Sequence, residues 1–205
     1  MEKRLTIRNI NAGSDTDIFY CPVARKDVVL PEGFSVFLPD TCCERRKYEL
    51  LTIQYIIISV TTQSGPVKYN PDGKPLLPGL KKHISISHSA EYAAVMISEY
   101  PCGVDVEKIS GRTEAVAHKY LNDSERNLIS DENRDFLHTL LWSAKEALFK
   151  ITGQPDFRLH MTALNLPGKE DKFIDMEVFV KEKTKVFTIF YTIFDGHVLT
   201  WTYER

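Results

Sequence analysis

The stretch Gly103-Val104-Asp105-Val106-Glu107 places two carboxylates two residues apart inside an apolar, β-branched run. Val104 and Val106 favour a strand, in which every second side chain points to the same face. Asp105 and Glu107 should therefore lie side by side, roughly 7 Å apart along the strand, while the valines face a core. Neighbouring carboxylates repel each other unless a cation or a proton lies between them. The stretch thus indicates a Mg²⁺ site, although an acidic, solvated edge strand explains these five residues as simply.

Residues 142–150 predict a helix that adds a third carboxylate and a cation. Its apolar residues form one stripe at helical spacing: Leu140, Ala144, Ala147, Leu148 and Ile151. Trp142, Glu146 and Lys150 fall on the other side, where Glu146 and Lys150 are helix neighbours because they are four residues apart. A surface ion pair of this kind contributes only a few tenths of a kcal/mol. Beside the two carboxylates of the strand, the same residues would complete a metal and phosphate site.

Taken together, the two segments resemble the signature motifs of the 4′-phosphopantetheinyl transferases, Gly-Val-Asp-Val-Glu and Trp-Ser-x-Lys-Glu-Ala-x-x-Lys. Two shorter matches precede them. Ile86-Ser87-His88-Ser89 is similar to the Ser-His-Ser segment of the family, and Tyr69 with Gly73-Lys74-Pro75 is similar to its Gly-Lys-Pro segment. The four motifs occur in the family order over residues 69–150, and the chain resembles the longer, surfactin-synthetase-activating type.

The resemblance implies an α+β fold built as a pseudo-twofold pair of halves, each a long helix packed on a mostly antiparallel sheet. The halves would be residues 1–101 and residues 102–205, with the metal-binding carboxylates in the second. The order of elements read from the sequence agrees: strands, long helix, strands, then short helices, long helix, strands. A cleft between two such halves is a common place for a ligand.

The expected elements have the following bounds. In the first half, strands are expected near residues 5–10, 18–20, 28–30, 35–38, 84–89 and 92–97, and a long helix from Thr41 to before Gly65. Thr41 and Glu44 have the spacing of a capping box. In the second half, short helices are expected at residues 112–121 and 122–129, the latter capped by Asp123 or Ser124. A long helix capped by Ser130 or Asp131 should end at Gly153 and Pro155, before strands at residues 158–166, 173–183, 186–194 and 197–203. Asp195-Gly196 predicts a type I′ hairpin turn.

The resemblance further implies an enzyme, a holo-[acyl-carrier-protein] synthase. It would transfer the 4′-phosphopantetheine arm of coenzyme A to a serine of an acyl or peptidyl carrier protein and release adenosine 3′,5′-bisphosphate. Asp105, Glu107 and Glu146 would hold Mg²⁺, or alternatively Mn²⁺, against the pyrophosphate. Glu146, directly or through a water bound to the metal, would take the serine proton. Lys150 would bind coenzyme A and balance or protonate the leaving phosphate.

The implied coenzyme A contacts come from three further segments. Arg46, or alternatively Arg45, would contact coenzyme A from the first turn of the long N-terminal helix. Cations in that turn are opposed by the helix dipole, so either a bound anion or solvation must favour them. Gly73-Lys74-Pro75 would let the backbone approach the ligand and offer a phosphate partner, although a plain turn has the same composition. Ser87 and His88, near a strand end, would hold phosphate oxygens.

Composition limits the remaining classes of function. The chain has 205 residues, 43% of them hydrophobic, which is enough for one sizeable core or two small ones. A net charge of −2 and a pI near 6.3 give no sign of a nucleic-acid or membrane surface, and no apolar run is long enough to span a bilayer. The first residues lack a signal-peptide core, so we expect a cytoplasmic protein. We also expect a monomer, because one chain supplies both halves. The four cysteines lack zinc-ligand spacing and should be free thiols.

Two other functions fit the same residues. A different metal-dependent, pyrophosphate-cleaving enzyme would use a water in place of the carrier serine and would need no protein partner. A non-catalytic coenzyme A-binding protein would have no need of three carboxylates beside a pyrophosphate. The sequence does not indicate whether the carrier protein that receives the arm belongs to fatty-acid, polyketide or peptide synthesis.

Overall fold

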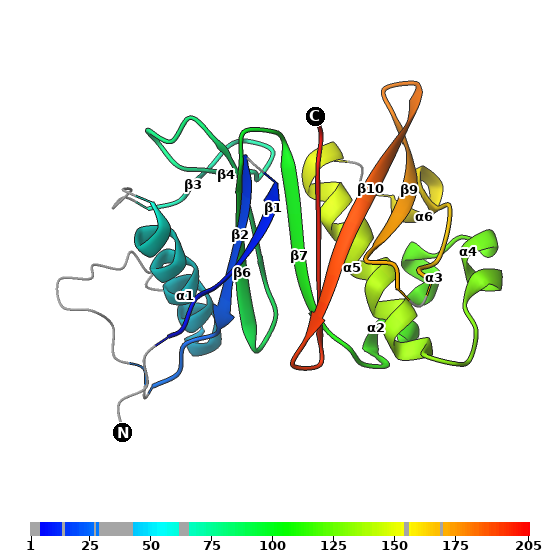
Figure 1. Cartoon of the computed structure of the whole chain (residues 1–205), viewed down its shortest axis with the longest axis horizontal. Coiled ribbons are helices and arrows are strands. Elements are labelled where there is room, and N and C mark those ends of the chain that lie inside the picture. Colours follow the sequence, from blue (N-terminus) through cyan, green and yellow to red (C-terminus); the bar gives the residue numbers. More distant parts are fainter. Residues whose placement is uncertain are drawn as a thin grey trace. The chain divides into compact units, whose positions relative to one another are not determined.

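The computed structural model describes residues 5–13, 15–26, 28, 43–61, 66–153, 156–168 and 170–205. The chain forms two compact units, Met1–Tyr100 and Pro101–Arg205. Each unit contains an antiparallel sheet with one long helix packed on it (Figure 1). The mixed α+β fold with antiparallel sheets that the sequence predicts is confirmed.

The first unit holds a four-stranded sheet in the order β1-β2-β6-β5. Its strands are β1 (Arg8–Gly13), β2 (Thr16–Pro22), β5 (His83–His88) and β6 (Tyr92–Ser98), and all neighbours are antiparallel. A short hairpin pairs β3 (Lys68–Tyr69) with β4 (Pro75–Leu76). Helix α1 (Glu44–Val60) packs against β2 and β6. The core between them is built from Cys21, Ile53, Ile56, Ile57, Ala93 and Val95.

The start of α1 differs from the prediction. Its N-cap is Cys43, whose backbone is extended and whose side chain makes no capping hydrogen bond. Glu44 is therefore the first helical residue, and its carboxylate pairs with Lys26 at 3.1 Å. The predicted capping box of Thr41 and Glu44 is wrong, and Thr41 itself lies outside the described residues. Three other parts of the prediction also lie outside the described residues: Gly65, the expected strand 35–38, and the expected strand 28–30 except for residue 28.

The second unit holds a five-stranded antiparallel sheet in the order β7-β11-β10-β9-β8. Its strands are β7 (Cys102–Lys108), β8 (Met161–Ala163), β9 (Phe173–Val180), β10 (Lys183–Phe194) and β11 (His197–Tyr203). Helix α5 (Arg134–Thr152) packs against β7 and β11. Shorter helices are α2 (Arg112–Ala115), α3 (Ala117–Tyr120), α4 (Asp123–Leu128) and α6 (Phe157–His160). The expected single helix over residues 112–121 is thus two, and the expected strand over residues 158–166 is α6 followed by β8.

The caps of α4 and α5 also differ from the prediction. Asn122 caps α4 and forms a capping box with Glu125, while the Ser124 hydroxyl donates to the Asn122 side chain at 2.6 Å. Neither Ser124 nor Asp123 is the cap. Helix α5 starts after Asn133, in the left-handed conformation with φ of 63°. The expected caps, Ser130 and Asp131, are used in the preceding loop: Ser130 donates to the Glu132 carbonyl, and Asp131 binds Arg134.

The predicted turns and core of the second unit agree better with the structure. Gly153, with φ of 69°, ends α5, while Pro155 lies outside the described residues. Asp195 and Gly196 both have positive φ, as a type I′ turn requires. The predicted apolar stripe of α5 is buried. It packs on sheet residues that include Ile174, Met176, Val178, Ile189 and Val198.

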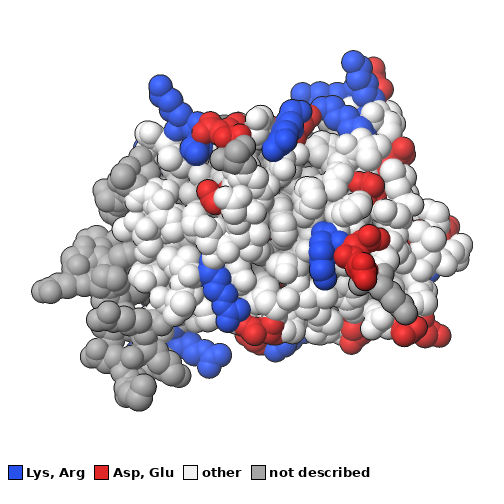
Figure 2. All heavy atoms as spheres, viewed as in Figure 1, with Lys and Arg blue, Asp and Glu red and all other residues white. Residues whose placement is uncertain are grey.

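Three cysteines lie in the described part of the chain, Cys21, Cys43 and Cys102, and they are free thiols, as predicted. Burial raises the pKa of Cys21 and of Cys102 to about 12. Cys42 lies outside the described residues. Among the residues described, no helix is both long and apolar enough to cross a membrane. Figure 2 shows one face of the molecule, where basic and acidic side chains are interspersed.

Candidate active site

Strand β7 presents Asp105 and Glu107 to the helix that covers it. Asp105 is only 4% exposed and Glu107 is partly buried, and both bond to side chains of α5. Val104 and Val106, which alternate with them, are fully buried. This is the arrangement expected for a strand whose side chains alternate between two faces.

Trp142, Glu146 and Lys150 form one stripe along α5, since residues four apart share a helix face. At one end of the stripe, Trp142 Nε1 donates to Glu107 Oε1 at 3.2 Å. At the other end, Lys150 Nζ donates to Asp105 Oδ1 at 3.0 Å. Glu146 lies between these two anchors. The structure thus brings together all the residues of the second unit that the sequence predicts for the site.

The close approach of α5 to β7 depends on Gly103. A Cβ at this position would lie 1.9 Å from the carbonyl oxygen of Ala147, so any side chain would collide with helix backbone. A second contact ties the helix to β11, where the hydroxyls of Ser143 and Thr200 lie 2.9 Å apart. Thr200 is the register partner of Asp105. Small and hydroxyl residues thus set how closely the carboxylates of the strand face the helix.

The site concentrates negative charge in a partly buried place. Burial first, and then the charges of Asp105 and Glu146, raise the pKa of Glu107 to about 7, against the opposing effects of Trp142 and Lys150. Burial and the charge of Asp105 likewise raise the pKa of Glu146 to about 7, again opposed by Lys150. One ammonium group therefore faces three carboxylates, and a second cation would relieve their repulsion.

The donor set fits a hard divalent cation, because carboxylate oxygens are the protein ligands that Mg²⁺ and Mn²⁺ prefer. Within the described ranges, no three His, Cys, Asp or Glu side chains are already arranged to hold a metal ion. Asp105 and Glu107 instead bond to Lys150 and Trp142. Glu146, Asp105 and Glu107 are the residues that could turn toward an ion here.

In the first unit, Arg46 and His88 meet around a buried carboxylate that sequence analysis did not single out. Glu49 is 4% exposed and accepts from Arg45 Nε at 3.0 Å and from Arg46 Nη1 at 3.2 Å. Arg46 Nη1 also donates to His88 Nε2, and His88 Nδ1 lies 3.3 Å from Glu49 Oε2. Ser87, the neighbour of His88 at the end of β5, is buried. Two guanidinium groups around one carboxylate leave positive charge for an anion.

A cavity of about 720 Å³ lies beside this cluster, within the first unit. Its polar lining includes Arg8, Arg25, Arg45, Tyr48 and Glu91. Cavities of about 300–1,000 Å³ are typical of small-molecule sites. Arg45 lines the cavity, whereas Arg46 contacts His88, so the two arginines that the sequence left as alternatives occupy different surroundings.

The segment Gly73-Lys74-Pro75 belongs to the β3–β4 hairpin. Gly73 has φ of 78°, and the Lys74 backbone N–H donates to Asn70 Oδ1 at 2.8 Å. These are contacts of an ordinary turn, and they leave the Lys74 side chain exposed. A contact of this hairpin with coenzyme A stays a prediction.

The segment that matches a known protein family nearly coincides with the second unit. A sequence model of the 4′-phosphopantetheinyl transferase superfamily matches residues 101–201. Residues 101–201, nearly all of the second unit, therefore have the sequence pattern of this superfamily. The resemblance drawn from the motifs is thereby confirmed.

Curated relatives of the superfamily agree with this assignment. A 4′-phosphopantetheinyl transferase of Bacillus subtilis is 28% identical over 111 residues, which are 52% of this chain and 49% of the relative. The 4′-phosphopantetheinyl transferase ffp of Bacillus subtilis is 31% identical over 111 residues, with the same two coverages. The 4′-phosphopantetheinyl transferase psf-1 of Bacillus pumilus is 31% identical over 87 residues, 40% of this chain and 37% of the relative. The matched segments span about half the length of the relatives, or less.

Proposed function

We propose that this protein transfers the 4′-phosphopantetheine arm of coenzyme A to a serine of an acyl or peptidyl carrier protein. The reaction would depend on Mg²⁺, or alternatively on Mn²⁺, and would release adenosine 3′,5′-bisphosphate. The names of the superfamily relatives suggest the reaction class. Within the chain, the observation that supports the proposal is the stripe of Trp142, Glu146 and Lys150 anchored to the two carboxylates of β7.

In the proposed reaction, Asp105, Glu107 and Glu146 would hold the ion, which supplies charge stabilisation for the pyrophosphate. The serine Oγ forms a bond to the phosphorus that carries the pantetheine arm, and the bridging P–O bond breaks. Glu146 would take the serine proton, directly or through a water. Lys150 then faces the negative charge that grows on the departing bisphosphate.

The cluster in the first unit supports the coenzyme A part of the proposal. Arg46 and His88, held together around Glu49, would bind phosphate oxygens of the nucleotide. Further contacts with coenzyme A would come from Ser87 and from the hairpin residues Gly73, Lys74 and Pro75. We further propose that the protein acts as a monomer in the cytoplasm, and light scattering that shows a stable trimer would contradict the monomer.

The decisive experiment is mass spectrometry of an apo carrier protein incubated with coenzyme A, Mg²⁺ and this protein. The carrier should gain the mass of one phosphopantetheine arm, and the gain should vanish when its acceptor serine is replaced by alanine. Release of adenosine bisphosphate without any carrier would instead favour a pyrophosphate-cleaving hydrolase. Coenzyme A binding without turnover would favour a non-catalytic binding protein.

A further inference from the structure

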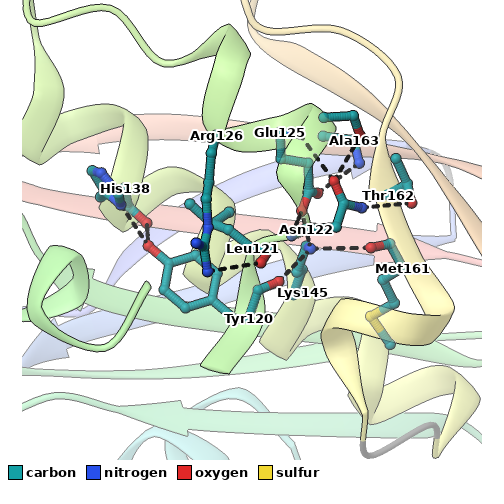
Figure 3. A network of polar contacts seen from close by, with 11 residues as sticks. Tyr120, Leu121, Asn122, Glu125, Arg126, His138, Lys145, Met161, Thr162 and Ala163 are labelled. Carbon is teal, nitrogen blue, oxygen red and sulfur yellow. Dashed lines mark hydrogen bonds and ion pairs between the residues drawn. The ribbon is translucent and has the colours of Figure 1, made fainter. Parts of the chain in front are cut away.

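Lys145 lies in the middle of the helical motif, yet its side chain points away from the carboxylates of β7 and into the core. It is fully buried, and its ammonium group uses all three of its donors (Figure 3). Nζ donates to Glu125 Oε2 at 2.7 Å, to the Tyr120 carbonyl at 2.6 Å and to the Met161 carbonyl at 3.0 Å. A lysine in this position has no access to a substrate.

Glu125 is fully buried as well and is bonded on both of its oxygens. Oε2 also accepts the Asn122 backbone N–H at 3.0 Å, and Oε1 accepts the Ala163 backbone N–H at 2.9 Å. The pair of Lys145 and Glu125 therefore joins four segments: the end of α3, the start of α4, the middle of α5 and the strand β8. Figure 3 shows the ammonium group of Lys145 among these partners.

Stability alone is a weak reason for such a pair. A buried ion pair often contributes no more than well-packed apolar residues of the same volume, because both charges lose their hydration. Burial indeed lowers the pKa of Lys145, and the charge of Glu125 and its hydrogen bond oppose that shift. What the pair adds to the apolar packing is a fixed direction for one polar side chain of α5.

That direction matters for the site because successive helix residues are about 100° apart around the axis. If Lys145 is held toward α4 and β8, Glu146 is held at a fixed angle from it. Tyr120, whose carbonyl accepts from Lys145, adds a second support. Its ring meets the Trp142 ring edge-on at 5.3 Å, and its hydroxyl contacts His138 Nδ1 at 2.9 Å. Trp142 in turn donates to Glu107.

We propose that Lys145 is a positioning residue: its buried pair with Glu125 fixes the rotation of α5, so that Trp142 and Glu146 face the carboxylates of β7. The effect on catalysis rests on the proposed function, whereas the effect on side-chain direction does not. Lys145 acts here through other residues and contacts no substrate.

The test compares variants that remove the pair with variants that remove an equivalent exposed pair. The double variant Glu125→Gln/Lys145→Met leaves no lone buried charge and keeps a side-chain oxygen for the Ala163 N–H. The matched control is Lys185→Met/Glu204→Gln, which removes an exposed ion pair of the same unit. Glu125→Gln alone is the mildest change.

The first measurement is the indole N–H signal of Trp142 in ¹⁵N NMR spectra, with the signal of Trp201 as internal reference and a Trp142→Phe variant for assignment. The double variant should shift the Trp142 signal and speed its exchange with solvent, while the control leaves it unchanged. The second measurement is Mn²⁺ affinity from paramagnetic broadening of the same signal. Loss of a residue that orients metal ligands typically weakens metal binding or activity by about 10–100-fold, and we expect that loss in Mn²⁺ affinity and in kcat.

A purely structural role predicts a different result. The double variant would then melt at a lower temperature but keep the wild-type indole signal, Mn²⁺ affinity and kcat, and that result overturns the proposal. If the double variant does not fold, an unchanged signal and affinity in Glu125→Gln overturn it instead. If the wild-type protein transfers nothing to a carrier, the proposed function fails, and the indole signal still decides whether Lys145 positions Trp142.

Discussion

The ammonium group of Lys150 lies against Asp105, 3.0 Å from Oδ1, and its second bond, of 2.6 Å, reaches the carbonyl of Val104. The helix cation is therefore joined to the strand rather than free in solvent, and its side chain is only 22% exposed. A surface pair of Glu146 and Lys150, which the sequence allowed, does not describe this contact. In the proposed reaction, this charge would face the pyrophosphate beside the carboxylates.

Replacing Lys150 by alanine should lower kcat far more than it weakens coenzyme A binding. Its charge matters most when the departing bisphosphate gains charge, and loss of one such contact typically costs about 10²–10³ in rate. Lys150→Arg should recover only part of the rate, because Arg keeps the charge but does not act as an acid. Steady-state kinetics with calorimetric coenzyme A affinity separates the two effects. A variant with normal kcat and a slightly lower melting temperature would show that the contact is only structural.

Removing the metal or Asp105 should abolish transfer without unfolding the protein. EDTA should stop the reaction and added Mg²⁺ should restore it, whereas Asp105→Ala should stay inactive at any Mg²⁺ concentration. The fold should survive, since the loss of one of three mutually repelling carboxylates relieves charge. Glu177→Ala, at an exposed position of β9, is the control and should keep full activity. Transfer at wild-type rate in EDTA or in Asp105→Ala would remove the metal assignment.

Gly103→Ala should destabilise the protein and disturb the site together. Its new methyl group would meet the Ala147 carbonyl at 1.9 Å, and overpacking of this kind typically costs about 1–3 kcal/mol. Chemical denaturation would measure the loss, with Gly111→Ala as the matched control, since a Cβ there meets its nearest atom at an ordinary 3.6 Å. Equal stability of the two variants would mean that α5 can move away from β7 without cost.

Arg46→Ala should weaken coenzyme A binding by about 10-fold, as expected for one lost hydrogen bond to a charged group. Dephospho-coenzyme A, which lacks the 3′-phosphate, tells where the guanidinium binds. If Arg46 contacts that phosphate, the variant should bind both compounds equally. Arg45→Ala is the matched control from the same helix turn. A larger effect in Arg45→Ala would assign the phosphate contact to the residue that lines the cavity.

The stability of the protein should fall in mild acid through His138. Burial lowers the pKa of this histidine, and the charge of Arg134 lowers it further. The charges of Glu114 and Asp135 act in the opposite direction. The unfolded chain therefore binds the proton more readily, and stability is lost as the pH falls below about 6.5, by at most about 1.4 kcal/mol per pH unit. The measurement is the difference in unfolding free energy between wild type and His138→Gln from pH 7.5 to 5, which cancels the other titrating groups. A difference independent of pH would contradict the prediction.

The parts of this structure that the sequence predicted are those with a repeating pattern. The alternation around Asp105 placed both carboxylates on one face of β7, and helical spacing placed Glu146 and Lys150 on the face of α5 opposite its apolar stripe. Such patterns depend only on neighbours in the chain. The cap of α5 was missed because Ser130 bonds within the preceding loop and Asp131 bonds to Arg134, the first residue of the helix.

The residues that sequence analysis missed are those whose role depends on a partner or an orientation that only the fold supplies. Lys145 is charged and looks like a surface residue, yet Glu125, twenty positions earlier, allows it to be buried. Glu49 had a visible signal in its spacing from Arg45 and Arg46, which lie four and three residues before it on one helix. Trp142 showed no signal for its bond to Glu107, since nothing local indicates which end of the strand the indole faces.

The missing side chain at Gly103 has an evolutionary consequence. At Gly103 the backbone of β7 directly faces the backbone of α5, and no side chain lies between them. The distance between strand and helix at this point therefore does not depend on the size of a side chain. A substitution of one acid or of the lysine would change the chemistry of the site and leave this spacing in place. Distant relatives with altered ligands should therefore be easier to detect by this glycine and the helix that crosses it than by the acids themselves.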